Sequence, residues 1–163
     1  MVAGNITEEV TTAVSAELLW KATFAGDESA LRKVLAGLID AVEVKGDGGP
    51  GSLFTLKFNP AVGAATVLKS RLAARDSAAR VISWDEVVVE GGEVAAEQFK
   101  SQVVQVKVEP AGAGGCVAKL TVEYERLDGT PLSPVDQAKL MKGYVGFIKK
   151  AEENLVARPG EFA

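Results

Sequence analysis

Apolar and polar residues alternate along most of this chain, which is the pattern of strands that bury one face. Turn segments such as Asp76-Ser77 and Gly91-Gly92 separate the alternating stretches. Strands joined by connections this short pair with their neighbours in antiparallel fashion, so we expect an antiparallel sheet of seven strands. The predicted strands span residues 6–14, 38–45, 52–59, 66–74, 80–90, 94–109 and 116–127.

Two short segments near the start of the chain have helical spacing instead. Ser15 suits the N-cap of a helix over residues 16–24, and Asp27 suits the N-cap of a second helix over residues 28–36. Gly37 follows the second helix and ends it. Because only a short joint at Gly26-Asp27 separates the two helices, we expect them to form a V.

A single long helix closes the chain. Ser133 is a good N-cap, Pro134 fits the first helical position, and Pro159 follows the predicted end. Elements in this order predict one α+β domain over residues 1–163, with a curved sheet wrapped round the last helix. Aromatic residues make up only 6% of the chain, so we expect the wrapped sheet to leave an internal cavity.

Composition excludes several kinds of site. The chain has no histidine and one cysteine, so we expect no histidine catalysis, no disulfide within the chain, no metal and no cofactor. The formal net charge of -4 argues against a nucleic-acid partner. No run of ~18 apolar residues predicts a membrane span, and the first residues do not have the pattern of a signal peptide. We therefore expect a cytoplasmic protein.

The loop between the second and third predicted strands has the sequence KGDGGPGS, over residues 45–52. Further segments follow in order: KSR at residues 69–71, VEGG at 89–92, GGCVAKL at 114–120 and EENLVARP at 152–159. With these motifs in this order, the chain resembles the plant pathogenesis-related class 10 proteins. They belong to the birch-pollen-allergen superfamily, which is START-like and includes the major latex proteins.

That resemblance implies a helix-grip fold, in which a seven-stranded antiparallel sheet grips the long C-terminal helix and two short helices support it. It also implies a cavity for amphipathic small molecules such as cytokinins, flavonoids and other plant hormones or secondary metabolites. Relatives are typically cytosolic and induced in defence or stress. Some are credited with ribonuclease activity, and some catalyse alkaloid condensations. We expect a monomer whose partners are such small molecules.

Alternation and the resemblance together predict the residues that contact a ligand. The third strand turns Phe54, Leu56 and Phe58 to the concave side, although such a stripe also suits an ordinary core. The predicted ligand-binding residues are Phe54, Leu56, Phe58, Arg71, Ile82, Trp84, Glu86, Val104, Leu120, Tyr124, Gly143, Tyr144 and Phe147.

The glycine-rich loop is predicted to be a rigid hairpin connection rather than a phosphate site. A phosphate-binding loop of the Walker type needs Gly-Lys-Ser or Gly-Lys-Thr at the start of a helix, whereas this loop leads into a strand. Glycines supply the positive φ angles that tight hairpins require. The loop residues are Gly46, Gly48, Gly49, Pro50 and Gly51.

Glu86 is unusual because its neighbours on the same strand face are the apolar Trp84 and Val88. An ionised carboxylate there either pairs with Arg71 on the neighbouring strand or lies hydrated at the open end of the sheet. By resemblance, Trp84 and Glu86 occupy positions where many relatives carry pocket tyrosines, so the ligand of a relative cannot be transferred. Cys116 is predicted to be a small buried apolar residue.

A carrier of amphipathic metabolites is the leading functional prediction, with Glu86, Arg71 and Tyr144 orienting the polar groups of the ligand. The alternative is an enzyme on the same fold, either a ribonuclease or a small-molecule condensing or isomerising catalyst that uses Glu86 or a lysine. A third class is an interaction protein that acts through the loop at residues 60–63.

The ribonuclease positions implied by the resemblance are only partly kept. Phe54 and Asn154 stand where a lysine and a tyrosine are expected. Glu152 matches, and the acid of the sixth strand is at best Glu97. Without histidine, a general base near neutral pH has to be a side chain whose pKa is strongly shifted.

Overall fold

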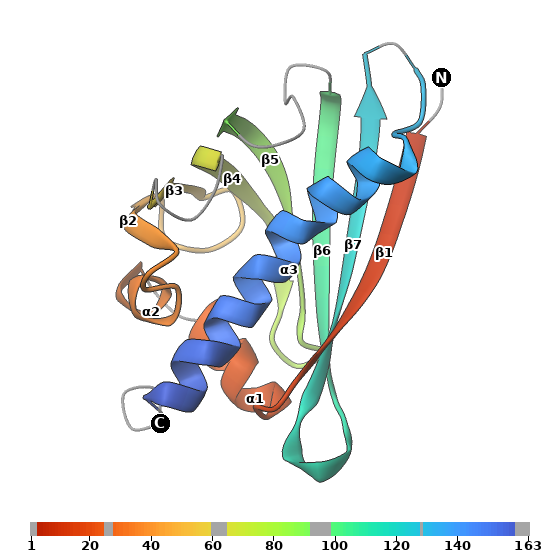
Figure 1. The fold of residues 1–163 in the computed structure, drawn as a ribbon. Coiled ribbons are helices and arrows are strands. Elements are labelled where there is room, and N and C mark those ends of the chain that lie inside the picture. Colours follow the sequence, from red (N-terminus) through yellow and green to blue (C-terminus); the bar gives the residue numbers. More distant parts are fainter. Residues whose placement is uncertain (1–2, 25–27, 60–64, 92–98, 128, 159–163) are drawn as a thin grey trace.

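Seven strands form one antiparallel sheet in the order β1-β7-β6-β5-β4-β3-β2 (Figure 1). The computed structural model describes residues 3–24, 28–59, 65–91, 99–127 and 129–158. The strands follow the chain around the sheet except β1, which pairs with β7. They are β1 (Ala3–Thr12), β2 (Ile39–Lys45), β3 (Leu53–Phe58), β4 (Ala65–Asp76), β5 (Val81–Gly91), β6 (Phe99–Pro110) and β7 (Cys116–Arg126). The predicted sheet is confirmed.

Two of the helices begin at the caps expected from the sequence, whereas Asp27, the expected cap of the helix between them, lies outside the described residues. Ser15 accepts a hydrogen bond from the backbone of Leu18 at 3.1 Å and starts α1 (Ala16–Leu19), which continues into a π-helical turn, η1 (Trp20–Phe24). The next helix is α2 (Glu28–Val34). Ser133 likewise accepts from the backbone of Asp136 at 3.2 Å and starts α3 (Pro134–Ala157). Each cap satisfies a backbone N–H that has no partner inside its helix.

Helix α3 runs diagonally across the concave face of the curved sheet, while α1 and α2 lie near its C-terminal end (Figure 1). Its buried residues are Met141, Tyr144, Ile148, Ala151 and Leu155. In β7, every second residue from Cys116 to Tyr124 is buried, as the alternation predicts. The facing residues of β6, Val104, Val106 and Val108, are at most 1% exposed. The predicted α+β helix-grip architecture is therefore confirmed.

Pairing in the sheet is interrupted by local irregularities. In β6, the register relative to β7 shifts between Phe99 and Ser101. In β4, it shifts at three places, one of which lies between Leu72 and Ala74. A bulge inserts an extra residue into one strand, so the residues beyond it change faces. The loop at residues 60–63 and Glu97 lie outside the described residues.

The glycine-rich loop is a compact connection between β2 and β3. Gly46 has a φ of 120°, and a side chain at this position would meet the Ser52 hydroxyl at 2.6 Å. The Asp47 carboxylate accepts from the backbone of Gly49 at 2.8 Å, and the Ser52 hydroxyl accepts from the backbone of Gly48 at 3.0 Å. The hydrogen bonds that Asp47 accepts from the Gly49 backbone and from the Ser52 hydroxyl lower its pKa. The backbone N–H groups of Gly48 and Gly49 are thus occupied by the loop itself.

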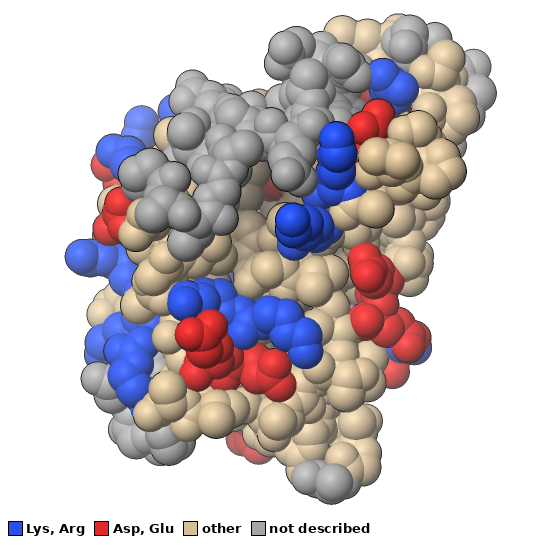
Figure 2. All heavy atoms as spheres, in the orientation of Figure 1, with Lys and Arg blue, Asp and Glu red and all other residues tan. Residues whose placement is uncertain are grey.

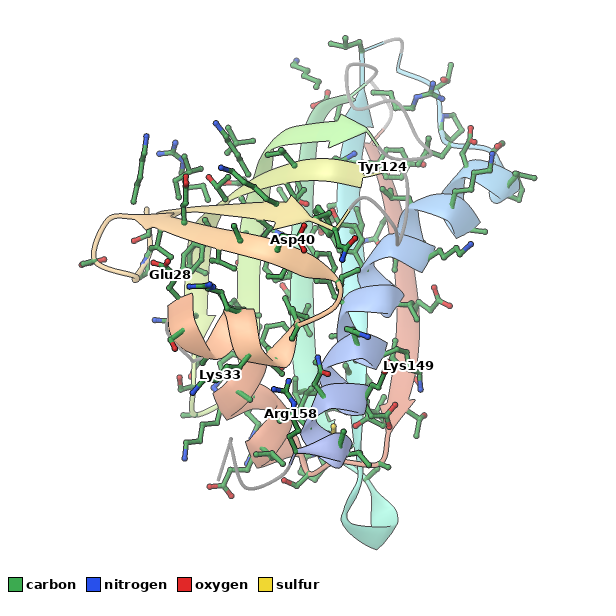
Figure 3. The ribbon with its side chains drawn as sticks, turned by 60° about the vertical axis from the view of Figure 1, so that its left-hand side comes forward. Glu28, Lys33, Asp40, Tyr124, Lys149 and Arg158 are labelled. Atoms are coloured by element: carbon green, nitrogen blue, oxygen red, sulfur yellow. The ribbon has the colours of Figure 1, made fainter. Side chains whose placement is uncertain are left out.

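Two side chains from the end of α3 hold the end of α2. The Asn154 side-chain amide donates to the carbonyls of Val34 at 2.8 Å and Ala36 at 3.1 Å. Arg158 donates to the carbonyl of Lys33 at 2.8 Å, and Figure 3 shows the two residues close together at this end of α3. The last carbonyls of a helix have no partner within it, so these bonds tie α2 to α3.

Replacing Asn154 with Ala is expected to lower the free energy of unfolding by about 1–3 kcal/mol, because carbonyls at the end of α2 lose their donor. Glu153→Ala is the matched control, since the Glu153 side chain is 67% exposed and bonds only to Lys150 among the described residues. Urea unfolding followed by circular dichroism measures both variants. Equal stability of the two would show that Asn154 does not hold α2.

Candidate functional site

A cavity lies between the sheet, α3 and the short helices. Its volume is about 120 Å³, several times what one buried water needs. Most of its wall is apolar, and the polar groups on it belong to Thr23, Ser70, Arg75, Tyr144 and the indole N–H of Trp84. The apolar lining residues are Phe24, Leu31, Leu35, Phe54, Leu56, Leu68, Leu72, Ile82, Trp84, Val106, Leu120, Phe147 and Ile148. Such a space suits a small molecule with a large apolar part.

Many of the residues proposed from the sequence lie in this wall. They are Phe54, Leu56, Ile82, Trp84, Leu120, Tyr144 and Phe147. Phe58 is not a wall residue and packs edge-on against Phe147, with ring centroids 5.6 Å apart. Val104 is fully buried beside the cavity, and Val106, two residues further along β6, forms the wall instead.

Three more of the predicted positions lie outside the cavity wall. Arg71 and Gly143 are exposed to solvent, because the alternation of β4 and the helical repeat of α3 turn them away from the interior. Tyr124 is buried but lies outside the cavity wall, and its hydroxyl accepts from the backbone of Leu132 at 2.8 Å. Its ring covers Gly4, whose missing side chain leaves room for it. Tyr124, labelled in Figure 3, therefore links β7 to β1 and to the segment that precedes α3.

Glu86 reaches two hydroxyl groups of the cavity wall. Tyr144, on α3, donates to Oε2 at 2.7 Å, and Ser70, on β4, donates to Oε1. Burial raises the pKa of Glu86 from 4.5 to about 7, although the hydrogen bonds from Ser70 and Tyr144 oppose the increase. Burial and the nearby Glu86 raise the pKa of Tyr144 well above 10. Glu86 therefore titrates near neutral pH.

Arg71 is not the partner of Glu86. Glu86 pairs with Ser70 across the β4–β5 ladder, and Arg71 pairs with Asp85, the next residue along. Arg71 and Asp85 are both exposed, so they lie on the outer face of the sheet. A strand residue and its sequence neighbour point to opposite faces, and this separates the arginine from the buried carboxylate.

Arg75 is the arginine that lines the cavity, and sequence reasoning missed it. Leu68, Ser70 and Leu72 are buried on the inner face of β4, so simple alternation would next place Ala74 inside. The irregularity between Leu72 and Ala74 shifts the strand by one residue, so that Ala74 is exposed and Arg75 is partly buried. Its guanidinium donates to the carbonyls of Phe24 at 3.4 Å and Gly48 at 3.3 Å.

Metal and thiol chemistry have little support in the described residues. In that part of the chain, no group of three His, Cys, Asp or Glu residues is arranged to hold a metal ion. Cys116 is buried, its Sγ lies 3.0 Å from the Thr12 hydroxyl, and burial raises the pKa of its thiol. A thiol that stays protonated is a poor nucleophile, so Cys116 acts as a small core residue.

The ribonuclease positions serve other purposes where the structure describes them. Phe54 lies in the cavity wall, and Asn154 holds α2. Glu152 accepts a hydrogen bond from the backbone of Ala13 at 2.6 Å and lies 3.4 Å from Lys149. These contacts bind the end of β1 to α3.

The face of the molecule seen in Figure 2 has no large patch of only basic or only acidic side chains among the described residues. Basic and acidic side chains lie next to one another there, among the described residues. Lys149 and Lys150 on α3 each lie 3.4 Å from a glutamate one turn away, Glu152 and Glu153 respectively. Phosphate backbones require clustered positive charge, so this face does not suit a nucleic acid. No helix in the described ranges has the length and apolar character needed to cross a membrane.

A curved antiparallel sheet closed by a long helix around an apolar cavity defines the helix-grip class of proteins. The chain belongs to the pathogenesis-related protein Bet v 1 family, whose model matches residues 1–158. The family resemblance expected from the sequence is thus confirmed.

Individual relatives are similar along nearly the whole chain. Pathogenesis-related protein 1 of Asparagus officinalis is 28% identical over 160 residues, which cover 98% of each protein. The crystal structure of Ara h 8.0201 matches with a TM-score of 0.75 at 21% identity, over 95% of this chain and 99% of that one. Norcoclaurine synthase from Thalictrum flavum, solved in complex with dopamine and hydroxybenzaldehyde, has a TM-score of 0.66 at 24% identity, over 96% and 88%. These structures support the fold.

Proposed function

We propose that this protein binds amphipathic small molecules, such as plant hormones, flavonoids or other secondary metabolites, in its internal cavity. The observation that carries the proposal is the cavity wall, in which a few polar side-chain groups interrupt an otherwise apolar lining. Apolar surface supplies most of the binding free energy in such a pocket, and a few polar groups set the orientation of the ligand. We propose a cytoplasmic monomer that acts in defence or stress as a carrier or buffer of these molecules.

The polar groups around Glu86 would distinguish between ligands by their hydrogen-bonding groups. Tyr144 and Ser70 line the cavity, and both donate to the Glu86 carboxylate behind them. When Glu86 is protonated, its single O–H can donate to one of these hydroxyls, while the other hydroxyl still donates to the second carboxyl oxygen. A ligand hydroxyl or carbonyl placed here therefore meets a group of hydroxyls that serve as either donors or acceptors.

Filling the cavity is expected to abolish binding. Leu56→Trp places a larger side chain on the inner face of β3, within the cavity wall. The neutral fluorophore N-phenyl-1-naphthylamine should bind the unaltered protein and be displaced by amphipathic metabolites. We expect Leu56→Trp to weaken its binding at least tenfold, because the added ring takes the space of the probe.

Lys57→Trp is the matched control, because Lys57 is the next residue along β3 and is exposed on the outer face. It adds a similar bulk without entering the cavity, and we expect unchanged binding of the fluorophore. Circular dichroism establishes that both variants are folded. Equal binding by both folded variants would place the ligand outside the cavity and contradict the proposed function.

Catalysis in the same cavity is the second candidate function. It is favoured by Glu86, whose pKa of about 7 suits proton transfer at neutral pH, and by its hydrogen bond to Tyr144 at 2.7 Å. A condensation of an amine with an aldehyde is the reaction class to test, with dopamine and a hydroxybenzaldehyde as substrates. Product formation that Glu86→Gln removes while fluorophore binding persists would establish catalysis. Equal slow turnover in both proteins would exclude Glu86 as the catalytic residue.

A further inference from the structure

The cavity has a second polar region, at the end formed by η1 and the last part of β4. Arg75 and Thr23 both line the cavity there. Thr23 belongs to the π-helical turn that follows α1, and Arg75 donates to the carbonyl of Phe24, the next residue of that turn. Single π-helical turns inside a helix often occur at functional sites, because they turn a side chain out of the regular repeat. The turn and the irregularity in β4 thus bring two polar side chains together.

Arg75 has hydrogen-bonding capacity left in the cavity. A guanidinium carries five N–H donors, and the two bonds to Phe24 and Gly48, at 3.4 and 3.3 Å, are long ones to neutral carbonyls. No carboxylate in the described part of the chain lies within ion-pair distance of Arg75. A partly buried guanidinium without an acid is a ready partner for a planar anion, which it can hold through two parallel hydrogen bonds.

Thr23 provides a second, independent observation that points to a ligand at this end of the cavity. Its side chain is 7% exposed, and its hydroxyl has no hydrogen-bond partner among the described residues. Buried hydroxyl groups in proteins nearly always have a partner, since leaving one unpaired costs about 1–3 kcal/mol. A ligand atom in the cavity would supply the missing partner.

We infer that Arg75 and Thr23 form an anion-binding end of the cavity and that the ligand is an amphipathic carboxylic acid, bound as its carboxylate. The inference rests on the proposed function, because the acid must enter the cavity. Arg75 would hold the carboxylate through two N–H groups, and the Thr23 hydroxyl would donate to the same oxygens. The apolar body would lie against the side chains of Leu56, Leu72 and Trp84, which line the cavity.

The two polar regions are far enough apart to act separately. Ser70, which bonds to Glu86, and Arg75 are five residues apart on β4, which corresponds to about 15 Å along a strand. Repulsion between the Glu86 carboxylate and a carboxylate at Arg75 is weak at this distance. A ligand with an acid at one end and a hydroxyl or carbonyl at the other would satisfy both regions.

The test compares decanoate with decanol, which share a chain and differ in charge. Each displaces N-phenyl-1-naphthylamine at pH 7.5, and the ratio of the two dissociation constants is measured. Arg75→Gln is expected to reduce the preference for decanoate by roughly 10- to 100-fold, the range for loss of a hydrogen bond to a charged group. Thr23→Val should reduce it by a smaller factor, and Arg75→Lys should retain part of it.

Arg71→Gln is the matched control, because it removes the same charge from the outer face of the same strand. We expect it to leave the preference unchanged. If the fluorophore does not bind the unaltered protein, the proposed function fails. If the fluorophore binds but decanoate is held no better in the unaltered protein than in Arg75→Gln, the anion site alone is overturned. If Arg75→Gln does not bind the fluorophore, Arg75→Lys and Thr23→Val are used to test the site. An unchanged preference for decanoate over decanol in both of these variants would overturn the anion site.

Discussion

Glu86→Gln is expected to stabilise the protein at pH 8 by up to about 3 kcal/mol while leaving its stability at pH 4 nearly unchanged. The pKa of Glu86 is about 7 in the folded protein against an ordinary value of 4.5. Each pKa unit corresponds to about 1.4 kcal/mol. The amide has the shape of the protonated acid and is never charged, so it avoids the cost of burying the carboxylate.

The direction of the effect follows from proton linkage. Between pH 4.5 and about 7 the folded state keeps the proton of Glu86 and the unfolded state loses it. The contribution of this group to stability is therefore fully present below pH 4.5 and is lost as the pH rises through the folded pKa. The difference in unfolding free energy between Glu86→Gln and the unaltered protein should grow from near zero at pH 4 to its largest value above pH 7.

Asp85→Asn serves as the control, because Asp85 precedes Glu86 on β5 and is exposed on the outer face. Its difference from the unaltered protein should vary little with pH over the same range. Urea unfolding at pH 4, 6 and 8 measures all three proteins. A difference for Glu86→Gln that stays constant with pH would mean that the carboxylate is hydrated in the folded state.

Leu120→Ala is expected to destabilise the protein by about 2–5 kcal/mol. Leu120 is 1% exposed, lies on β7 between β1 and β6, and forms part of the cavity wall. The substitution removes apolar surface from the core and enlarges a space that is already present. We therefore expect the folded variant to bind N-phenyl-1-naphthylamine at least as tightly as the unaltered protein does.

Leu127→Ala is the matched control, since Leu127 follows β7 directly and is 68% exposed. Its effect on the free energy of unfolding should stay within about 0.5 kcal/mol. Comparing Leu120→Ala with Leu56→Trp separates stability from binding. Leu120→Ala lowers the free energy of unfolding and leaves the cavity open, whereas Leu56→Trp fills the cavity. A loss of binding by folded Leu120→Ala would contradict the placement of the ligand against β7.

Binding and catalysis make different demands on the same polar groups. A carrier needs Glu86 and Arg75 only to orient its ligand, so conservative substitutions at these positions should change which ligands compete. A catalyst needs the proton of Glu86 to move, so Glu86→Gln should abolish turnover and keep the ligand bound.

Local sequence determined the architecture of this protein. The period-two pattern of β7 from Cys116 to Tyr124 and the caps Ser15 and Ser133 act over a few residues, and the structure has each of them as expected. Alternation also placed Phe54, Leu56, Trp84 and Leu120 in the cavity wall correctly, because one buried face per strand leaves two choices and hydrophobicity selects between them.

Only the tertiary structure decided which polar groups reach the cavity. A shift of one residue in β4 puts Arg75 inside, and the run Ala73-Ala74 carries no local signal of it. Arg71 was the expected arginine, but it lies between the buried residues Ser70 and Leu72 and therefore points outward. The bonds of Glu86 to Ser70 and Tyr144 join residues 16 and 58 positions apart. Such contacts depend on strand register and on the position of α3, which are set by packing across the whole fold rather than by neighbouring residues.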